Sequence, residues 1–202
     1  MWFAPLVGLL YGCAADLGLK YSASMCEEIV PFQDGPRPGT PPTIALIIGA
    51  TIVGTILAAR GVPMLGLTVF AVLVVSLVAS WYSDVRCGIV PDFFTLVPLV
   101  LVFGIALIER NPMPILSAVI VFVPFAAAAL FSKGLGMGWG DVKLVALGAA
   151  VLGLRSSVLA FSAACLLAVL IAMIRRRRDE PVAFVPYLAS SITVALTIPI
   201  FP

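Results

Sequence analysis

Two aspartates stand at the ends of apolar stretches in this chain. Asp141 follows Gly138-Trp139-Gly140 at the start of one stretch, and Asp84 lies at the end of an earlier one. A charged side chain beside the hydrocarbon of a membrane is costly and is normally functional. Two neighbouring carboxyl groups cannot easily both ionise, so they share a proton and supply one base and one acid. The pair predicts an acid–base hydrolase with Asp84 and Asp141 as the catalytic residues.

A third aspartate in the same region has a simpler explanation. Asp92 follows Pro91 and precedes two phenylalanines, which is typical of a helix cap or a first-turn acid. Asp84 instead ends a predicted helix, where the helix dipole disfavours an anion. We therefore expect Asp92 to have a structural role and Asp84 a chemical one.

The neighbours of Asp141 are interpreted as supporting or substrate-binding residues. Gly138 and Gly140 allow a positive φ and a close approach of another chain, so a substrate strand could reach the carboxylate. The alternative is a tightly packed helix entry, with Asp141 favoured by the dipole as a first-turn acid. Lys143 does not share a helix face with Asp141. It either reaches the lipid headgroups, as long cationic side chains do, or contacts the substrate.

The elements that position these residues are predicted to be membrane helices. The 202 residues are 62% hydrophobic and 11% charged, against about 25% charged in a soluble domain, and the mean hydropathy is +1.17. We expect an all-α, polytopic bundle of about eight transmembrane segments that forms a single domain over residues 1–202. The segments are 2–19, 43–59, 62–82, 93–108, 113–131, 141–154, 157–174 and 183–201.

Short turns are expected between most segments, among them one at 154–157, and residues 20–42 are interpreted as a loop because they contain five prolines. The segment 141–154 would be only about 21 Å long at 1.5 Å per residue. Since the hydrocarbon core is about 30 Å thick, Asp141 is expected to be recessed into the membrane.

Composition also limits the partners and cofactors. The net charge of +2 forms no DNA-sized patch, so no nucleic-acid partner is expected. The chain has no histidine and no CxxC pair, which disfavours a zinc site. Cys13 and Cys165 are interpreted as small apolar residues within helices, in preference to any disulfide. The hydrolytic interpretation requires no metal and no cofactor.

The distribution of cationic residues predicts the orientation in the bilayer. If the loops after the first, third, fifth and seventh segments share a side, that side holds nine Lys and Arg residues and the other side three. The nine are Lys20, Arg37, Arg86, Lys133, Lys143, Arg175, Arg176, Arg177 and Arg178, and the three are Arg60, Arg110 and Arg155. The positive-inside rule makes the first side cytoplasmic, which places Asp84 and Asp141 at the same face.

The two aspartate motifs resemble those of a known family. The pattern Asp84-x6-Pro91-Asp92 and the run 136–144, Gly-Met-Gly-Trp-Gly-Asp-Val-Lys-Leu, are similar to the active-site motifs of the type IV prepilin peptidases, which are GxGD-type membrane aspartyl proteases. Residues 184–188 resemble a stretch of their last helix. The resemblance implies a multi-pass protein of the bacterial inner membrane that removes the basic leader of prepilins and pseudopilins at the cytoplasmic face, with Asp84 and Asp141 as the catalytic pair.

The chain also departs from that family, and other functions remain open. Many relatives carry a methyltransferase region, often with two CxxC pairs, where this chain has residues 20–42, so we expect cleavage without N-methylation. A proton-coupled transporter would also use intramembrane acids, but acids at one face rather than the midplane disfavour it. A presenilin-type protease is disfavoured because the chain lacks a Tyr-Asp pair at Asp84 and a Pro-Ala-Leu motif.

Overall fold

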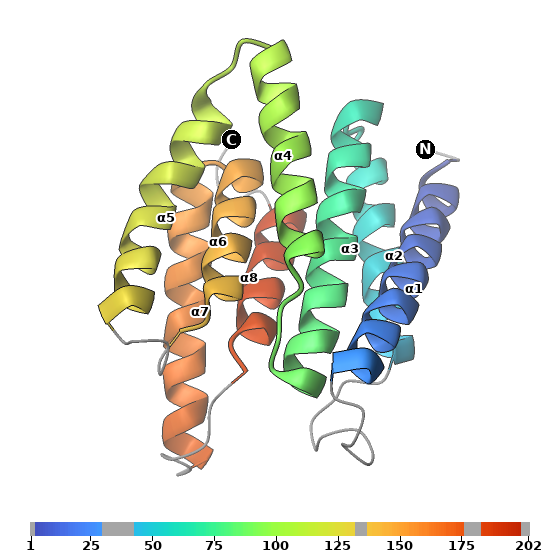
Figure 1. Cartoon of the computed structure of the whole chain (residues 1–202). Coiled ribbons are helices and arrows are strands. Elements are labelled where there is room, and N and C mark those ends of the chain that lie inside the picture. Colours follow the sequence, from blue (N-terminus) through green and yellow to red (C-terminus); the bar gives the residue numbers. More distant parts are fainter. Residues whose placement is uncertain (1–2, 30–42, 132–136, 176–182, 199–202) are drawn as a thin grey trace. The chain divides into compact units, whose positions relative to one another are not determined.

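The computed structural model describes residues 3–29, 43–131, 137–175 and 183–198, and the elements within these ranges are eight α-helices (Figure 1). They are α1 (Ala4–Ile29), α2 (Thr43–Ala59), α3 (Met64–Cys87), α4 (Asp92–Ile108), α5 (Met113–Phe131), α6 (Trp139–Leu152), α7 (Leu154–Arg175) and α8 (Val185–Thr197). Each predicted apolar segment overlaps mainly one helix, and the segment 141–154 also includes Leu154, the first residue of α7. The prediction of an all-helical fold is confirmed.

Several of these helices have the length and composition of membrane spans. Within the described residues, α3, α5 and α7 (to Ile174) are long and apolar enough to cross a bilayer, and α2, α4 and α8 are shorter apolar helices. Apolar side chains are widely exposed on them, as expected where lipid replaces water. The chain is therefore a membrane protein.

The first helix is longer than the sequence suggested. α1 continues through residues 20–29, so the interpretation of 20–42 as a loop is wrong for this part, and residues 30–42 lie outside the described ones. No proline occurs between Pro5 and Pro31, and the exposed ion pair of Lys20 with Asp16 (2.7 Å) supports the helix across its polar stretch. Asp16 and Lys20 are one helical turn apart, and their ion pair gives a local role to Asp16.

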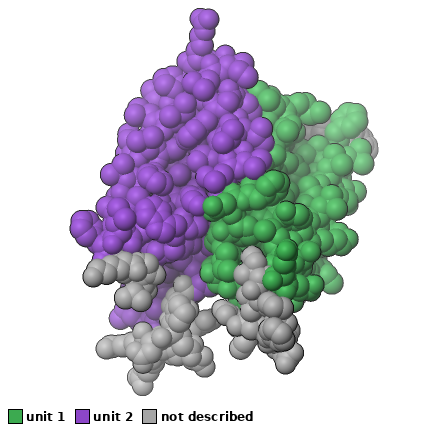
Figure 2. Space-filling model, in the orientation of Figure 1, with its two compact units in different colours: residues 1–94 green, residues 95–202 purple. Residues whose placement is uncertain are grey.

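The chain divides into two compact units, residues 1–94 and 95–202, which Figure 2 colours separately. Unit 1 contains α1, α2 and α3. Its core is built from buried side chains of all three helices, among them Ala15, Leu19, Val53 and Val78. The buried hydroxyl of Tyr11 donates a hydrogen bond to the Leu67 carbonyl, which ties α1 to the start of α3.

Glycines allow α1 and α2 to approach closely. A Cβ atom on Gly8 would lie only 2.7 Å from the Thr51 carbonyl oxygen, and a Cβ on Gly54 would lie 2.5 Å from the Tyr11 ring. Gly12, one turn after Gly8, faces the Thr51 side chain in the same way. This small-residue spacing is typical of close helix contacts in membranes.

In unit 2, α6 lies against α5, α7 and α8. Its residues 142 and 144–147 are almost fully buried, and its Gly148 leaves room for Ile192 of α8 and Phe161 of α7. Side chains of α4 pack on the same core through Val102 and Phe103. The helix that carries Asp141 is thus the most enclosed element of its unit.

The turn between α6 and α7 differs from the prediction. Only Gly153, with φ 77°, separates the two helices, whereas the sequence suggested a turn at 154–157. The left-handed backbone requires a residue without a Cβ, so the glycine ends α6 and allows α7 to begin at once. The Ser157 hydroxyl donates to the Leu154 carbonyl within the first turn of α7.

Candidate active site

Asp84 lies in the last turn of α3, as predicted. The helix ends at Cys87, and Gly88, with φ 69°, caps it by donating its backbone N–H to the Asp84 carbonyl oxygen (2.8 Å). The Asp84 side chain is half-buried. The carboxyl is therefore carried by the last turn of α3, which Gly88 closes.

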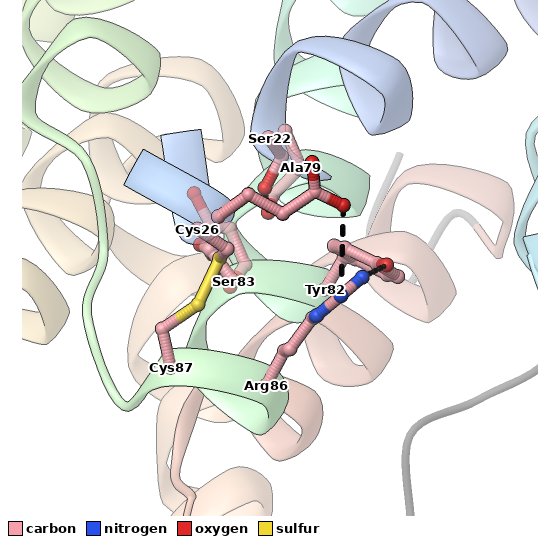
Figure 3. The surroundings of a disulfide bond; sticks show 9 residues. Ser22, Cys26, Ala79, Tyr82, Ser83, Arg86 and Cys87 are labelled. Carbon is pink, nitrogen blue, oxygen red and sulfur yellow. Dashed lines mark hydrogen bonds and ion pairs between the residues drawn. A yellow bond between two sulfur atoms is a disulfide. The ribbon is translucent and has the colours of Figure 1, made fainter. Parts of the chain in front are cut away.

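A disulfide joins this helix end to α1. Cys26 in α1 and Cys87 in α3 are bonded, with their Cα atoms 6.1 Å apart (Figure 3). The expectation of no disulfide is therefore wrong for these two residues, because the continuation of α1 brings Cys26 beside the end of α3. Cys13 and Cys165 are free, and both lie within helices as expected.

Polar contacts follow the same seam between α1 and α3. The buried Ser22 hydroxyl donates to the Ala79 carbonyl (3.1 Å), and the Arg86 guanidinium hydrogen-bonds the Tyr82 hydroxyl while lying 5.6 Å from the centre of that ring (Figure 3). Arg86 also approaches the exposed Glu27 carboxylate at 3.9 Å. Residues on both sides of Asp84 are thus anchored to α1 or to each other.

Asp92 occupies the position expected of a structural acid. It is the first residue of α4, is exposed, and lies in the turn where the helix dipole favours a negative charge. The rings of Phe93 and Phe94 that follow it pack against Tyr21 of α1, with centroids 5.8 and 5.7 Å away. The first-turn prediction for Asp92 is confirmed.

Asp141 lies in the first turn of α6, and only 9% of it is exposed. Its carboxylate accepts a hydrogen bond from the backbone N–H of Gly138, the residue that caps the helix (3.2 Å). This bond satisfies one of the donors that a helix start leaves without an internal partner. A buried carboxylate that is stabilised at a helix N-terminus is suited to hold a negative charge.

The residues around Asp141 correct one expectation. Gly138 is extended, with φ −77° and ψ 151°, and Gly140 is helical, so neither uses the positive φ that was suggested for them. A Cβ on Gly138 would meet the Asp141 carboxylate at an ordinary 3.5 Å. Gly138 is exposed and Lys143 is half-buried two residues beyond Asp141. Gly138 leaves the backbone in front of Asp141 uncovered by a side chain.

Each unit contributes one of the predicted catalytic carboxyls. Asp84 belongs to unit 1 and Asp141 to unit 2, and the geometry above describes each in its own unit. Sequence reasoning missed Arg86 and the pair Cys26 and Cys87 as neighbours of Asp84. Arg86 and Cys87 could have been identified as neighbours from the sequence, because they lie two and three residues after Asp84.

Comparisons with known proteins address the identity of the chain. A search of curated proteins and a search of solved structures each gave no match. The family model described as the type IV leader peptidase family matches residues 71–173, which is just over half of the chain. The matched region includes Asp84, Asp92 and the whole of α6, and it ends before residues 184–188. On this evidence the chain belongs to the type IV leader peptidase family.

Proposed function

We propose that the chain is an aspartyl endopeptidase that cleaves the leader of type IV prepilins or pseudopilins at the cytoplasmic face of the inner membrane. Membership of the family suggests prepilin peptidase activity and implies an aspartic peptidase. The observation that carries the proposal is the burial of Asp141 at the start of a helix within the matched region. Burial of a carboxyl is costly in a membrane protein, and a carboxyl that is buried there usually has a function.

In the proposed mechanism, residues 1–202 form one peptidase domain, and Asp84 and Asp141 are its two catalytic carboxyls. One carboxylate removes a proton from a water molecule, while the other, protonated, donates a hydrogen bond to the scissile carbonyl. The Gly138 N–H bond and the helix dipole favour the negative charge on Asp141, so we assign it the role of base. Asp84 lies in the last turn of α3, at the negative end of the helix dipole, which disfavours an anion. We therefore assign it the role of acid.

The proposed substrate site uses the exposed backbone around Gly138. Because this residue has no side chain, an extended peptide has room to approach the Asp141 carboxylate. Gly140 and Lys143 are assigned supporting roles. The proposed partners are the prepilin or pseudopilin and the lipid bilayer.

The α6 helix also supports a recessed site. Its 14 residues span about 21 Å at 1.5 Å per residue, which is shorter than a hydrocarbon core of about 30 Å. Asp141 would therefore lie below the membrane surface and the leader peptide would enter the cytoplasmic half of the bilayer. The proposal includes eight transmembrane segments, of which α6 is the shortest but one.

Co-expression tests the function directly. The intact chain should shorten a co-expressed prepilin by its leader, measured as a mass difference of the pilin, because the proposed pair hydrolyses one peptide bond. The Asp141→Ala variant, made at the same level in the membrane, should leave the prepilin intact. If every prepilin and pseudopilin of the host keeps its leader in the presence of the intact chain, the proposed substrate class is wrong.

The proposed orientation predicts which helix ends are accessible from outside the cell. Phe131, at the end of α5, and Glu109, in the turn before it, are both exposed. Phe131→Cys should resist, and Glu109→Cys should accept, a membrane-impermeant maleimide applied to intact spheroplasts, because nine of twelve Lys and Arg residues lie on the proposed cytoplasmic side.

The same labelling after lysis is the control for that experiment. Both variants, in a background without the four native cysteines, should then react. The reverse pattern in intact spheroplasts, with Phe131→Cys labelled and Glu109→Cys protected, would place the proposed active site outside the cytoplasm.

A further inference from the structure

The disulfide between Cys26 and Cys87 lies one helical turn from a proposed catalytic carboxyl. Cys87 is the third residue after Asp84 on α3, and the bond fastens this turn to the last turn of α1. Sixty-one positions separate the two cysteines in the sequence. The bond is therefore a tertiary connection at the site and not a feature of one local turn.

The bond lies where a permanent structural disulfide is not expected. The charge distribution assigns the ends of α1 and α3 to the cytoplasmic side, where Arg86 adjoins Cys87. Cytosolic thiols are kept reduced, and the disulfides that do form there are mostly transient, catalytic or redox-sensing. A cysteine pair placed to bond at this membrane face is therefore expected to exchange between dithiol and disulfide.

We propose that Cys26 and Cys87 form a reversible redox pair that slows leader cleavage when it is oxidised. This inference rests on the proposed function of Asp84. The oxidant class is a small-molecule disulfide such as oxidised glutathione. The peptidase acts as the dithiol under reducing conditions, and the disulfide is the restrained form.

Formation of the bond needs no reactant other than oxidised glutathione. Cys87 is the more exposed of the two, so its thiolate attacks the glutathione disulfide, forms a mixed disulfide and releases one glutathione thiolate. The Cys26 thiolate then attacks the Cys87 sulfur and releases the second glutathione thiolate. The two protein thiols lose two electrons and two protons overall, and one glutathione disulfide becomes two glutathione thiols.

The contacts around Asp84 explain why the bond would affect catalysis. Without the disulfide, the end of α3 is joined to α1 by the packing of Tyr82 in the core of unit 1, by the Ser22 bond to Ala79, five residues before Asp84, and by the approach of Arg86 to the exposed Glu27. An exposed ion pair of this kind contributes little to stability. Oxidation therefore removes much of the freedom of the turn that carries Asp84. In this inference, the turn that carries Asp84 adjusts when a peptide substrate binds.

The test uses the full-length protein in lipid nanodiscs with a purified prepilin, equilibrated in glutathione buffers from fully reduced to fully oxidised. Three quantities are measured at each ratio. They are the fraction of linked Cys26–Cys87 peptide by mass spectrometry, the amide hydrogen exchange of residues 80–90, and the rate of leader cleavage. Oxidation should form the link, slow the exchange and lower the cleavage rate about tenfold or more, since a displacement of ~1 Å of a catalytic group can cost about 100-fold.

Matched cysteine variants separate this pair from the other thiols. Cys13→Ser/Cys165→Ser should respond to glutathione like the wild-type chain, because both of those cysteines are free. Cys26→Ser/Cys87→Ser, which can form neither the link nor a glutathione adduct at Cys87, should cleave like the reduced wild type at every ratio and should show no change in exchange at residues 80–90.

The possible outcomes distinguish the inference from the proposed function. A link that persists in fully reduced buffer, a link that never forms, or a cleavage rate that does not follow the link overturns the redox inference alone. Cleavage that is absent in both states, while the link forms and breaks reversibly, overturns the proposed function and the regulatory inference with it.

Discussion

Asp84→Asn and Asp141→Asn should each lower the rate of leader cleavage by at least about 100-fold, because positioned general acids and bases typically contribute 10²–10⁴-fold. Asparagine keeps the size of the side chain but can neither accept a proton from water nor donate an acidic one. For Asp141, the amide oxygen can still accept the Gly138 N–H bond, so the helix start should be retained. The measurement is the initial rate of cleavage of a prepilin in membranes with equal amounts of each variant.

Asp92→Asn is the matched control, because Asp92 is eight residues from Asp84 and belongs to the same motif. Its exposed first-turn position explains it without chemistry, and asparagine is also tolerated at a helix start. This variant should cleave at a rate close to that of the wild type. Near-normal cleavage by either dyad variant would refute the assignment of the pair, and a loss in Asp92→Asn as large as theirs would refute the structural role of Asp92.

The helices were predictable wherever apolar composition defines them. The segment 43–59 matches α2 and 113–131 matches α5 at both ends, because charged residues, glycines and prolines bound these runs. α1 was misjudged because its last turns contain Lys20, Glu27 and Glu28, which a hydropathy pattern assigns to a loop. Helix propensity and the Asp16–Lys20 pair sustain this part of the helix.

The candidate site was predictable in its motifs but not in its tertiary neighbours. Asp84 at a helix end, Asp92 in a first turn and Asp141 at a helix start all follow from local sequence. The bond between Cys26 and Cys87 does not, because it requires the length of α1 and the packing of α1 on α3. The extended backbone of Gly138 was likewise missed, since glycine is compatible with either sign of φ.

The packing of α1 on α2 leads to the second large effect. Gly8→Ala should destabilise the protein by about 1–3 kcal/mol, as overpacking of a well-packed core typically does. The new Cβ would lie 2.7 Å from the Thr51 carbonyl oxygen, and a backbone atom cannot move aside by rotating a side chain. The α1 and α2 axes would have to separate, and Gly8→Leu should prevent stable folding. The measurement is the apparent melting temperature in detergent. It is determined from the loss of the monodisperse peak in size-exclusion chromatography after heating.

Gly49→Ala in α2 provides the matched control for that result. A Cβ at Gly49 would meet no atom within 4 Å, so the substitution adds a methyl group without a clash. Alanine is also favoured over glycine within a helix by roughly 0.5–1 kcal/mol, and Gly49→Ala should therefore melt at or slightly above the wild-type temperature. Equal melting temperatures for Gly8→Ala and Gly49→Ala would mean that α1 and α2 are not in close contact at Gly8. A selective loss in Gly8→Ala would support the close contact that holds α1, and with it Cys26, in unit 1.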